Sequence, residues 1–343
     1  MSPVRRSIPN IVHALLICLL ASGGTSARGG SIAGWGRGSE GQIGHGMREL
    51  VRDPATGVVI STRGEIPLSP NQPVLVDLPE SVGISREDTA HFESLGIQKD
   101  DIKQLSAGRE HTLLLTTRGH VYVWGNSTRK LGRGRLGDST APADRRSPTR
   151  IPPERFEDRK IVQVAAGDFH SLAVDETGQV WGWGDNSSGQ LGMDGIPVDT
   201  QGRLWEAGPS TTPTLQKESV LVPIKLCVRQ PETNVVIPLK VPSVILRRAL
   251  TGRFVSQPRP FIAAGEKHSL VIAEANGVSS PWCVYAFGDN TDGQTTSSSG
   301  HPVLISADGV PISPTWVIAG PKSSLAFEDA NLIGDWGFNS GTR

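Results

Sequence analysis

The chain has 343 residues, and its 34 Lys plus Arg balance its 34 Asp plus Glu, so the formal net charge is zero. This balance argues against a global electrostatic attraction to nucleic acid, although a local basic patch can still bind it. Three cysteines without CxxC spacing indicate neither a disulfide framework nor a zinc site. The 40 Gly and 25 Pro, with many short apolar runs, are typical of an all-β chain rich in turns.

The N-terminal segment, residues 1–31, has two interpretations. Two arginines precede an apolar run at 11–21, and small residues follow, as in a secretory signal peptide. The run is too short to cross a bilayer as a helix, so no transmembrane span is predicted. Alternatively, His13-Ala14-Leu15-Leu16-Ile17 is a strand of a first repeat, because it matches a segment that recurs along the chain. The strand interpretation favours the cytoplasm or nucleus, and the signal peptide implies secretion.

Residues 32–343 repeat one phrase: Ala-Gly-x-x-His, a short apolar run, a Gly-containing turn, and a second strand that ends in an aromatic residue and Gly. The aromatic-Gly pair occurs at Trp35-Gly36, Trp124-Gly125, Trp183-Gly184, Phe287-Gly288 and Trp336-Gly337. His111, His170 and His268 stand in three copies of the first half, and Ser323 takes this place in a fourth. A period of about 50–60 residues built from strand pairs predicts a radial or stacked β array.

The spacing inside the repeat is constant. One interval separates the first Gly from the Gly of the aromatic pair in three copies: Gly108 to Gly125, Gly167 to Gly184 and Gly320 to Gly337. The interval from Gly265 to Gly288 is longer because its turn is extended. Since a hairpin tolerates changes in its turn but not in its paired strands, this spacing predicts hairpins of one fixed register.

Further apolar segments lie upstream of the repeats, at 73–76, 148–151 and 222–226. Strand prolines fit only edges or first positions, so these segments are predicted to enter the repeats at blade margins. Long polar insertions occupy 47–101 and 193–256, and the apolar stretches within the second are a candidate for a degenerate blade.

A single hairpin cannot bury its apolar face, so the hairpins must pack on one another around an axis or along a line. His, Trp and Gly at fixed places favour a propeller, whose blades narrow towards a central channel, over a linear solenoid. We therefore predict an all-β propeller with long loop insertions.

The pattern Ala-Gly-x-x-His-x-Leu followed by Gly-x-Val-x-x-Trp-Gly-x-Asn-x-x-Gly-Gln-Leu-Gly resembles the repeat of the regulator of chromosome condensation family. The resemblance is close over 107–195, good over 261–294, and partial over 32–46 and 316–341. It implies a β-propeller, usually of seven blades closed by strands from both chain ends. Because only five aromatic-Gly marks are present, it also implies a shortened, incomplete or divergent member.

Three recurring histidines, His111, His170 and His268, are the obvious candidates for catalysis or metal binding. They occupy equivalent points of different repeats, so a propeller arranges them in a ring and not in a cluster. We interpret them as hydrogen-bonded framework residues, together with the aromatic residues Trp124, Trp183, Phe287 and Trp336. No metal is predicted, and GxGxxG matches at 36–41 and 132–137 fall in repeat turns, so no cofactor is predicted either.

The two variable positions of each Gly-x-x-His turn are candidate partner contacts: Arg109, Glu110, Asp168, Phe169, Glu266 and Lys267. Charged and aromatic residues on loops held by a rigid scaffold suit recognition, whereas the alternative is an ordinary solvated turn. In exchange factors of the resembling family this face meets a small GTPase, and an acidic residue directly before the His matters. That role is implied for Glu110, but Phe169 takes this position in the next repeat, with Asp168 one place earlier.

A basic run from Arg129 to Arg150 is compatible with nucleosomal DNA or an acidic partner, or with a solvated loop, and no aromatic interleaving supports base stacking. Nothing in the sequence combines a nucleophile, a base and an orienting group, so no enzymatic chemistry is predicted. Three alternative functions remain as hypotheses: a scaffold that binds another protein, an exchange factor for a small GTPase, or a secreted propeller that inhibits a target enzyme.

Overall fold

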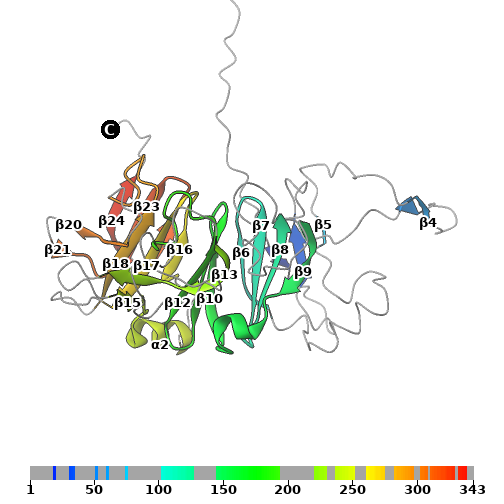
Figure 1. Cartoon of the computed structure of the whole chain (residues 1–343), viewed down its shortest axis with the longest axis horizontal. Coiled ribbons are helices and arrows are strands. Elements are labelled where there is room, and N and C mark those ends of the chain that lie inside the picture. The colour runs from blue at the N-terminus through cyan, green and yellow to red at the C-terminus, as the bar shows by residue number, and fades with distance from the viewer. Residues whose placement is uncertain are drawn as a thin grey trace, which may run out of the picture.

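The computed structural model of the chain is built almost wholly from antiparallel strands, which confirms the predicted all-β class (Figure 1). It describes residues 102–126, 144–193, 220–229, 236–251, 260–274, 282–296, 302–307, 310–328 and 331–337, and the backbone of five short strands before them. Those strands are β1 (Cys18–Leu20), β2 (Ser31–Gly34), β3 (Val51–Arg52), β4 (Val59–Ser61) and β5 (Val74–Leu75). Within this described part, no helix has the length and apolar character needed to span a membrane.

Four sheets follow one another along the chain, and we call them blades 1 to 4 (Figure 1). Blade 1 comprises β6 (Ile102–Ala107), β7 (His111–Thr116), β8 (Val121–Asn126) and β9 (Asp144–Arg150). Blade 2 comprises β10 (Ile161–Ala166), β11 (His170–Asp175), β12 (Val180–Gly184) and β13 (Val220–Lys225). Blade 3 comprises β16 (Ile262–Ala264), β17 (His268–Glu274), β18 (Trp282–Gly288) and β19 (Val303–Leu304). Blade 4 has β22 (Trp316–Ala319), β23 (Ser323–Glu328) and β24 (Asn331–Gly337).

The blades share one hairpin register, as the constant spacing predicted. The pairs across the second and third strands are His111–Gly125, His170–Gly184, His268–Gly288 and Ser323–Gly337. In three of these pairs the glycine has a positive φ, of +118° at Gly125, +100° at Gly184 and +115° at Gly288. A Cβ on Gly184 would lie 2.6 Å from the carbonyl oxygen of Phe169, so both the backbone conformation and the close approach require glycine.

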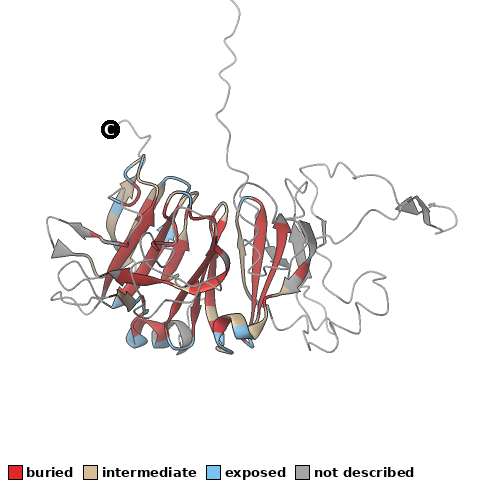
Figure 2. Ribbon diagram, in the orientation of Figure 1, coloured by how far each residue is buried: buried red, intermediate tan, exposed pale blue. Residues whose placement is uncertain are grey.

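The second strands of blades 1, 2 and 3 are buried along almost their whole length, whereas β23 of blade 4 alternates between buried and partly exposed residues (Figure 2). Every residue of β7 and of β11 is buried, which explains why these segments read as continuous apolar runs and not as alternating ones. The aromatic residue before each paired glycine lies in this interior: Trp124, Trp183 and Phe287 have no exposed surface. Trp336 in blade 4 is half-buried.

Successive blades pack face to face through their inner strands. Strand β10 contacts β6 and β7, strand β16 contacts β10 and β11, and strand β22 contacts β16 and β17. At one end of these strands the backbones approach closely: a Cβ on Gly108 would lie 2.1 Å from the carbonyl oxygen of Gly167, and one on Gly167 would lie 2.6 Å from that of Gly265. The first Gly of the repeat therefore lets neighbouring inner strands converge, as a propeller requires.

A buried histidine joins each blade to the next. The His111 Nε2 atom lies 2.9 Å from Ser171 Oγ, and the same bond recurs from His170 to Ser269 at 2.9 Å and from His268 to Ser324 at 3.0 Å. The hydroxyls of Ser269 and Ser324 donate to the backbone oxygens of Gln190 and Gln294, at 2.7 and 2.8 Å. A hydroxyl has one hydrogen, so in these two bonds the histidine must donate from Nε2, which assigns its tautomer.

Burial favours the neutral form of His170 and of His268. Burial is the main cause that lowers the pKa of His170 to about 3 and of His268 to about 4. A charged imidazole would carry an additional proton on Nδ1, and at Gly167 and Gly265 that side of the ring lies against the backbone of the turn. The bond to the next blade is therefore one between neutral groups.

Inner strands are also clamped by side chains that bond to the neighbouring backbone. Gln104 donates to the carbonyl oxygen of Val164 at 2.8 Å and accepts from the Val164 N–H at 3.1 Å. At the equivalent position of blade 2, the Gln163 Oε1 accepts from the N–H of Phe261 at 3.0 Å and of Ile262 at 3.3 Å. These amides replace strand pairing where two inner strands face one another.

Strands β9 and β13 lie at the outer edges of their sheets, as their prolines predicted. However, each pairs with the strand before it in the chain and completes that blade, so the interpretation as strands entering the next unit is wrong. Strand β5 likewise pairs with β2, in a sheet of order β1-β2-β5. His13 and Trp35 lie outside the described residues.

The insertion 193–256 does not form a blade in the part that the structure describes. It contributes the outer strand β13, a two-stranded sheet of β14 (Cys227–Arg229) and β15 (Val236–Pro238), and the helix α2 (Ser243–Thr251). The hypothesis of a hidden blade fails here because the apolar side chains Ile245 and Leu246 are used to cover the existing core. A further two-stranded sheet, β20 (Ser306–Ala307) and β21 (Val310–Pro311), precedes blade 4.

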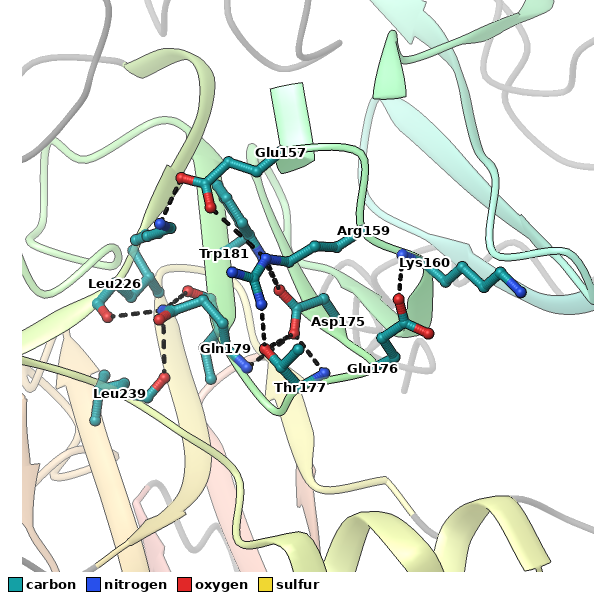
Figure 3. Close-up of polar contacts among 12 residues, drawn as sticks. Glu157, Arg159, Lys160, Asp175, Glu176, Thr177, Gln179, Trp181, Leu226 and Leu239 are labelled. Atoms are coloured by element: carbon teal, nitrogen blue, oxygen red, sulfur yellow. Dashed lines mark hydrogen bonds and ion pairs between the residues drawn. The ribbon is translucent and has the colours of Figure 1, made fainter. Parts of the chain in front are cut away.

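A polar network fastens the far end of blade 2, opposite the histidines (Figure 3). The buried Asp175 carboxylate accepts from the Thr177 N–H at 2.8 Å and from Trp181 Nε1 at 3.0 Å. Arg159, which follows the 3-10 helix η3 (Pro153–Phe156), lies 3.9 Å from the same carboxylate. Gln179 donates to the carbonyl oxygens of Val180, Leu226 and Leu239, which ties the insertion to the hairpin. These hydrogen bonds and the ion pair compensate the buried charge of Asp175, so we interpret it as a structural residue.

We predict that Gly184→Ala lowers the free energy of unfolding by about 2–5 kcal/mol, because it adds the cost of a left-handed backbone to that of an overpacked interior. Gly334→Ala in β24 is the matched control. Its added Cβ would meet only the ends of the Trp336 and Ile312 side chains, at 3.2 and 3.3 Å, so we expect a loss below about 1 kcal/mol. Denaturant unfolding measures both, and equal losses would contradict the register argument.

We also predict that the histidine bonds fail in acid. The pKa of His268 is depressed on folding, so its contribution to stability is present above its ordinary pKa of 6.5 and is lost as the pH falls towards about 4. His268→Gln keeps a side chain that can donate to Ser324 but does not titrate. The unfolding free energy of the wild type should fall relative to that of this variant by on the order of 3 kcal/mol between pH 6.5 and 4. A difference that is constant with pH would refute this explanation.

Candidate partner-binding face

The four Gly-x-x-His turns, with Ser for His in blade 4, lie at the same end of their blades. Each is closed by a bond from the Gly N–H to the carbonyl oxygen three residues later, at 2.8 to 2.9 Å, in the turns that start at Gly108, Gly167, Gly265 and Gly320. The loops that follow β12 and β18 start beside them, since the N–H groups of Asp185 and Asp289 each donate to the preceding turn at 2.9 Å. We call this end, formed by the four turns and these two loops, the turn face.

Neighbouring turns contact one another across the blade boundary. The Arg109 N–H donates to the carbonyl oxygen of Asp168 at 3.3 Å, and the Arg109 guanidinium lies 3.6 Å from the Asp168 carboxylate. The same guanidinium lies over the Phe169 ring, 5.6 Å from its centroid. Between blades 3 and 4, the Glu266 N–H donates to the carbonyl oxygen of Pro321 at 3.1 Å. The structure thus places Arg109, Asp168 and Phe169 in one contact group.

Among the charged residues of the turn face, Asp168 has a carboxylate whose charge is only partly compensated by its neighbours. Burial raises the pKa of its carboxyl, the negative charge of Glu266 raises it further, and Arg109 and Lys267 oppose the shift, which leaves the pKa at about 6. In blade 4, the Lys322 ammonium lies 3.1 Å from the Asp292 carboxylate, and this hydrogen bond raises the pKa of Lys322. The negative charge of Glu266 thus opposes ionisation of Asp168 on this face.

The six predicted contact residues differ in exposure. Arg109 is exposed, Asp168, Phe169, Glu266 and Lys267 are half-buried, and Glu110 is buried with 6% of its surface exposed. The carbonyl oxygen of Glu110 also lies where a Cβ on Gly125 would be, at 2.2 Å. The turn of blade 1 therefore presents Arg109 to solvent, and Asp168 in blade 2 is the more accessible acid. The sequence pattern had favoured Glu110 as the acidic contact.

Each of the two loops of the turn face contains an Asp, an Asn and a Gln to which the sequence analysis assigned no role. In blade 2, Gln190 donates to the Asp185 carboxylate at 2.8 Å, and the Leu191 N–H donates to Asn186 Oδ1 at 2.9 Å. Blade 3 repeats this network with Gln294 on Asp289 at 3.2 Å and the Thr295 N–H on Asn290 at 3.0 Å. The repeated letters Gly-Asp-Asn-x-x-Gly-Gln at 184–190 and 288–294 were a usable signal.

The sequence analysis also did not predict the role of the inner-strand glutamines. Gln104 and Gln163 both stand three residues before the Ala of Ala-Gly, so their recurrence was visible in the sequence. Phe261 takes this place in blade 3, which hid the pattern. The loop network stabilises each loop internally, and the inner-strand glutamines bond to the backbone of the next blade.

Among the described residues, no group of three or more His, Cys, Asp or Glu could hold a metal ion. The residues 127–143 of the basic run and both GxGxxG matches lie outside the described part of the chain. The nucleic-acid interpretation therefore stays a prediction. Cys227 and Cys283 are buried thiols, and burial raises the pKa of each to about 12, so neither is a reactive thiolate at neutral pH.

Comparison with known proteins supports the repeat assignment. Models of the regulator of chromosome condensation (RCC1) repeat match residues 102–130, 161–190 and 118–174. Protein pim1 of Schizosaccharomyces pombe is 34% identical over 114 residues, which cover 33% of this chain and 20% of pim1. The ultraviolet-B receptor UVR8 of Arabidopsis thaliana is 40% identical over 99 residues, 29% of this chain and 20% of that protein. The aligned region thus spans about a fifth of the length of these relatives.

Among solved structures, yeast RCC1 (Prp20) bound to Kap60 aligns with 99% of this chain and 58% of its own, at 20% identity and a TM-score of 0.48. The blade architecture stated above rests on the strand pairing within this chain and not on that alignment. The matched repeats coincide with blades 1 and 2, where the Gly-x-x-His turn, the His–Ser bond and the aromatic-Gly pair all occur. Residues 102–190 of this chain thus match the RCC1 repeat, and the described sheets are the blades of a β-propeller.

Proposed function

We propose that the turn face is a docking surface for another protein and that the chain acts as a non-enzymatic interaction module. The observation that carries this proposal is the contact group of Arg109, Asp168 and Phe169, in which an arginine and an aromatic ring are held together on rigid turns. Arginine and aromatic side chains dominate the energy of protein interfaces when a scaffold positions them in advance.

The turns are suited to this role because their backbone is fixed from below. In blades 1 to 3, the bond that closes the turn ends on the residue whose imidazole bonds to the next blade, so the two variable side chains project from a hydrogen-bonded base. A partner therefore pays little entropy for ordering these turns, in contrast to a long flexible loop.

The alternative is an exchange factor for a small GTPase, which the resemblance to the family implies. An acidic side chain close to the histidine of a turn supports it, and Asp168, which forms an ion pair with Arg109, provides one. The secreted inhibitor remains a hypothesis that depends on residues 1–31, of which the structure describes only the backbone of β1 and the first residue of β2.

The docking proposal predicts that Arg109→Ala and Phe169→Ala each weaken partner binding at least about tenfold, because each removes part of one hot-spot group. The matched control is Glu154→Ala, an exposed residue of η3 at the opposite end of the blades. Affinity purification with mass spectrometry identifies the partner from the wild-type chain, and titration of the purified partner measures each variant. Equal affinities for all four proteins would refute the role of the turn face.

The exchange alternative predicts faster release of a fluorescent nucleotide from at least one small GTPase of a purified panel. Asp168→Asn keeps the size of the side chain and removes its charge, so acceleration should drop at least about tenfold if that carboxylate acts on the partner. If the wild type accelerates none of the GTPases, the exchange function is rejected and the docking function is not.

A further inference from the structure

Arg109 is held by contacts with a single neighbouring turn. Its guanidinium reaches the Asp168 carboxylate at 3.6 Å and the Phe169 ring at 5.6 Å, while 52% of its side chain stays exposed. The Asp168 side chain is 13% exposed, so this ion pair has one partner in water and one largely shielded from it. The carboxylate therefore fixes the position of a side chain that is otherwise free to swing into solvent.

We propose that Asp168 is a proton-operated latch of the turn face, which holds Arg109 along the row of turns when ionised and releases it when protonated. The inference rests on the proposed docking function, because it assigns a regulation to the same face. It adds the prediction that Arg109 has two positions and that a single proton selects between them.

The charged groups that act on Asp168 lie on the turns of the two neighbouring blades, and further titratable groups lie on the loop after β12 and on the strands below. Arg109 and the buried Glu110 lie on the turn of blade 1, and Glu266 and Lys267 lie on the turn of blade 3. On the loop after β12, the Asp185 carboxylate is already bonded to Ser187 and Gln190. The histidines below, His170 and His268, are neutral, since burial depresses the pKa of both.

This arrangement favours the protonated acid more than a surface aspartate does. Removal from water and the charge of Glu266 both disfavour the carboxylate, and the exposed Arg109 compensates only in part, so the pKa of Asp168 lies at about 6. Proton uptake removes the charge that attracts Arg109, which leaves the ring of Phe169 as the contact on that turn. An exposed cation–π contact is weak, so the arginine becomes available to an acidic group of a partner.

The test follows the arginine side chains of the whole chain, labelled with ¹⁵N at arginine, by NMR from pH 7.5 to 4.5. The Nε–Hε signal of Arg109, assigned with Arg109→Lys, should shift with a midpoint near pH 6, while that of Arg155 on η3 should not show this midpoint. Asp168→Asn should abolish the titration. Glu266→Gln should lower the midpoint, because it removes a charge that disfavours the carboxylate.

A midpoint near pH 4, an Arg109 signal that does not move, or a titration that survives in Asp168→Asn would overturn the latch. Because the readout uses the chain alone, it separates this inference from the function on which it rests. A chain that titrates as expected but whose turn-face variants bind the partner normally contradicts the docking function. A chain that loses its partner in those variants but shows no titration contradicts the latch.

Discussion

The hydrogen bond between a buried histidine of one blade and a serine of the next is the interaction on which the described propeller depends. It recurs at 2.9, 2.9 and 3.0 Å and crosses each boundary between the four blades. In this interior the alternative to a bonded Nε2 is a buried polar atom without water, which costs more than the bond itself contributes. The bond therefore selects one relative position of the blades, in addition to stabilising them.

That selection reaches the surface through the backbone. The residue that supplies the imidazole also supplies the carbonyl oxygen that closes its turn, so a shift of the histidine would open the turn. The paired glycine below is in turn packed against a carbonyl oxygen of the same turn, as with Gly184 and Phe169. The packing of the interior consequently determines where Asp168 and Phe169 lie on the surface.

The sequence was sufficient to predict the all-β class, the repeat and its register, because these depend on features with a strict period. A residue such as Gly184 must be glycine for steric reasons, and such residues mark positions that every blade shares. The histidines were placed by the same reasoning at equivalent positions of different blades, and each one bonds to the serine of the next blade.

Other features were not predictable in this way because they depend on which strand pairs with which neighbour. The segments that become β9 and β13 have the same composition whether they open one blade or close another, and only the ladder to β8 and β12 decides. The exposure of Glu110 and Asp168 likewise depends on the neighbouring blade. Two adjacent turn positions looked equivalent in the sequence, although the structure buries Glu110 and leaves Asp168 partly accessible.

The length of the turn limits how such a protein can acquire a new partner. An added or deleted residue between Gly167 and His170 would break the bond that closes the turn and displace the imidazole from Ser269. Only the identities of Asp168 and Phe169 can change without that loss, and the same holds in the neighbouring turns. Partner recognition must therefore depend on a few side chains whose positions the scaffold determines. The charges of these side chains, such as Arg109, Asp168 and Glu266, and their interactions are then the property that substitution or protonation can change.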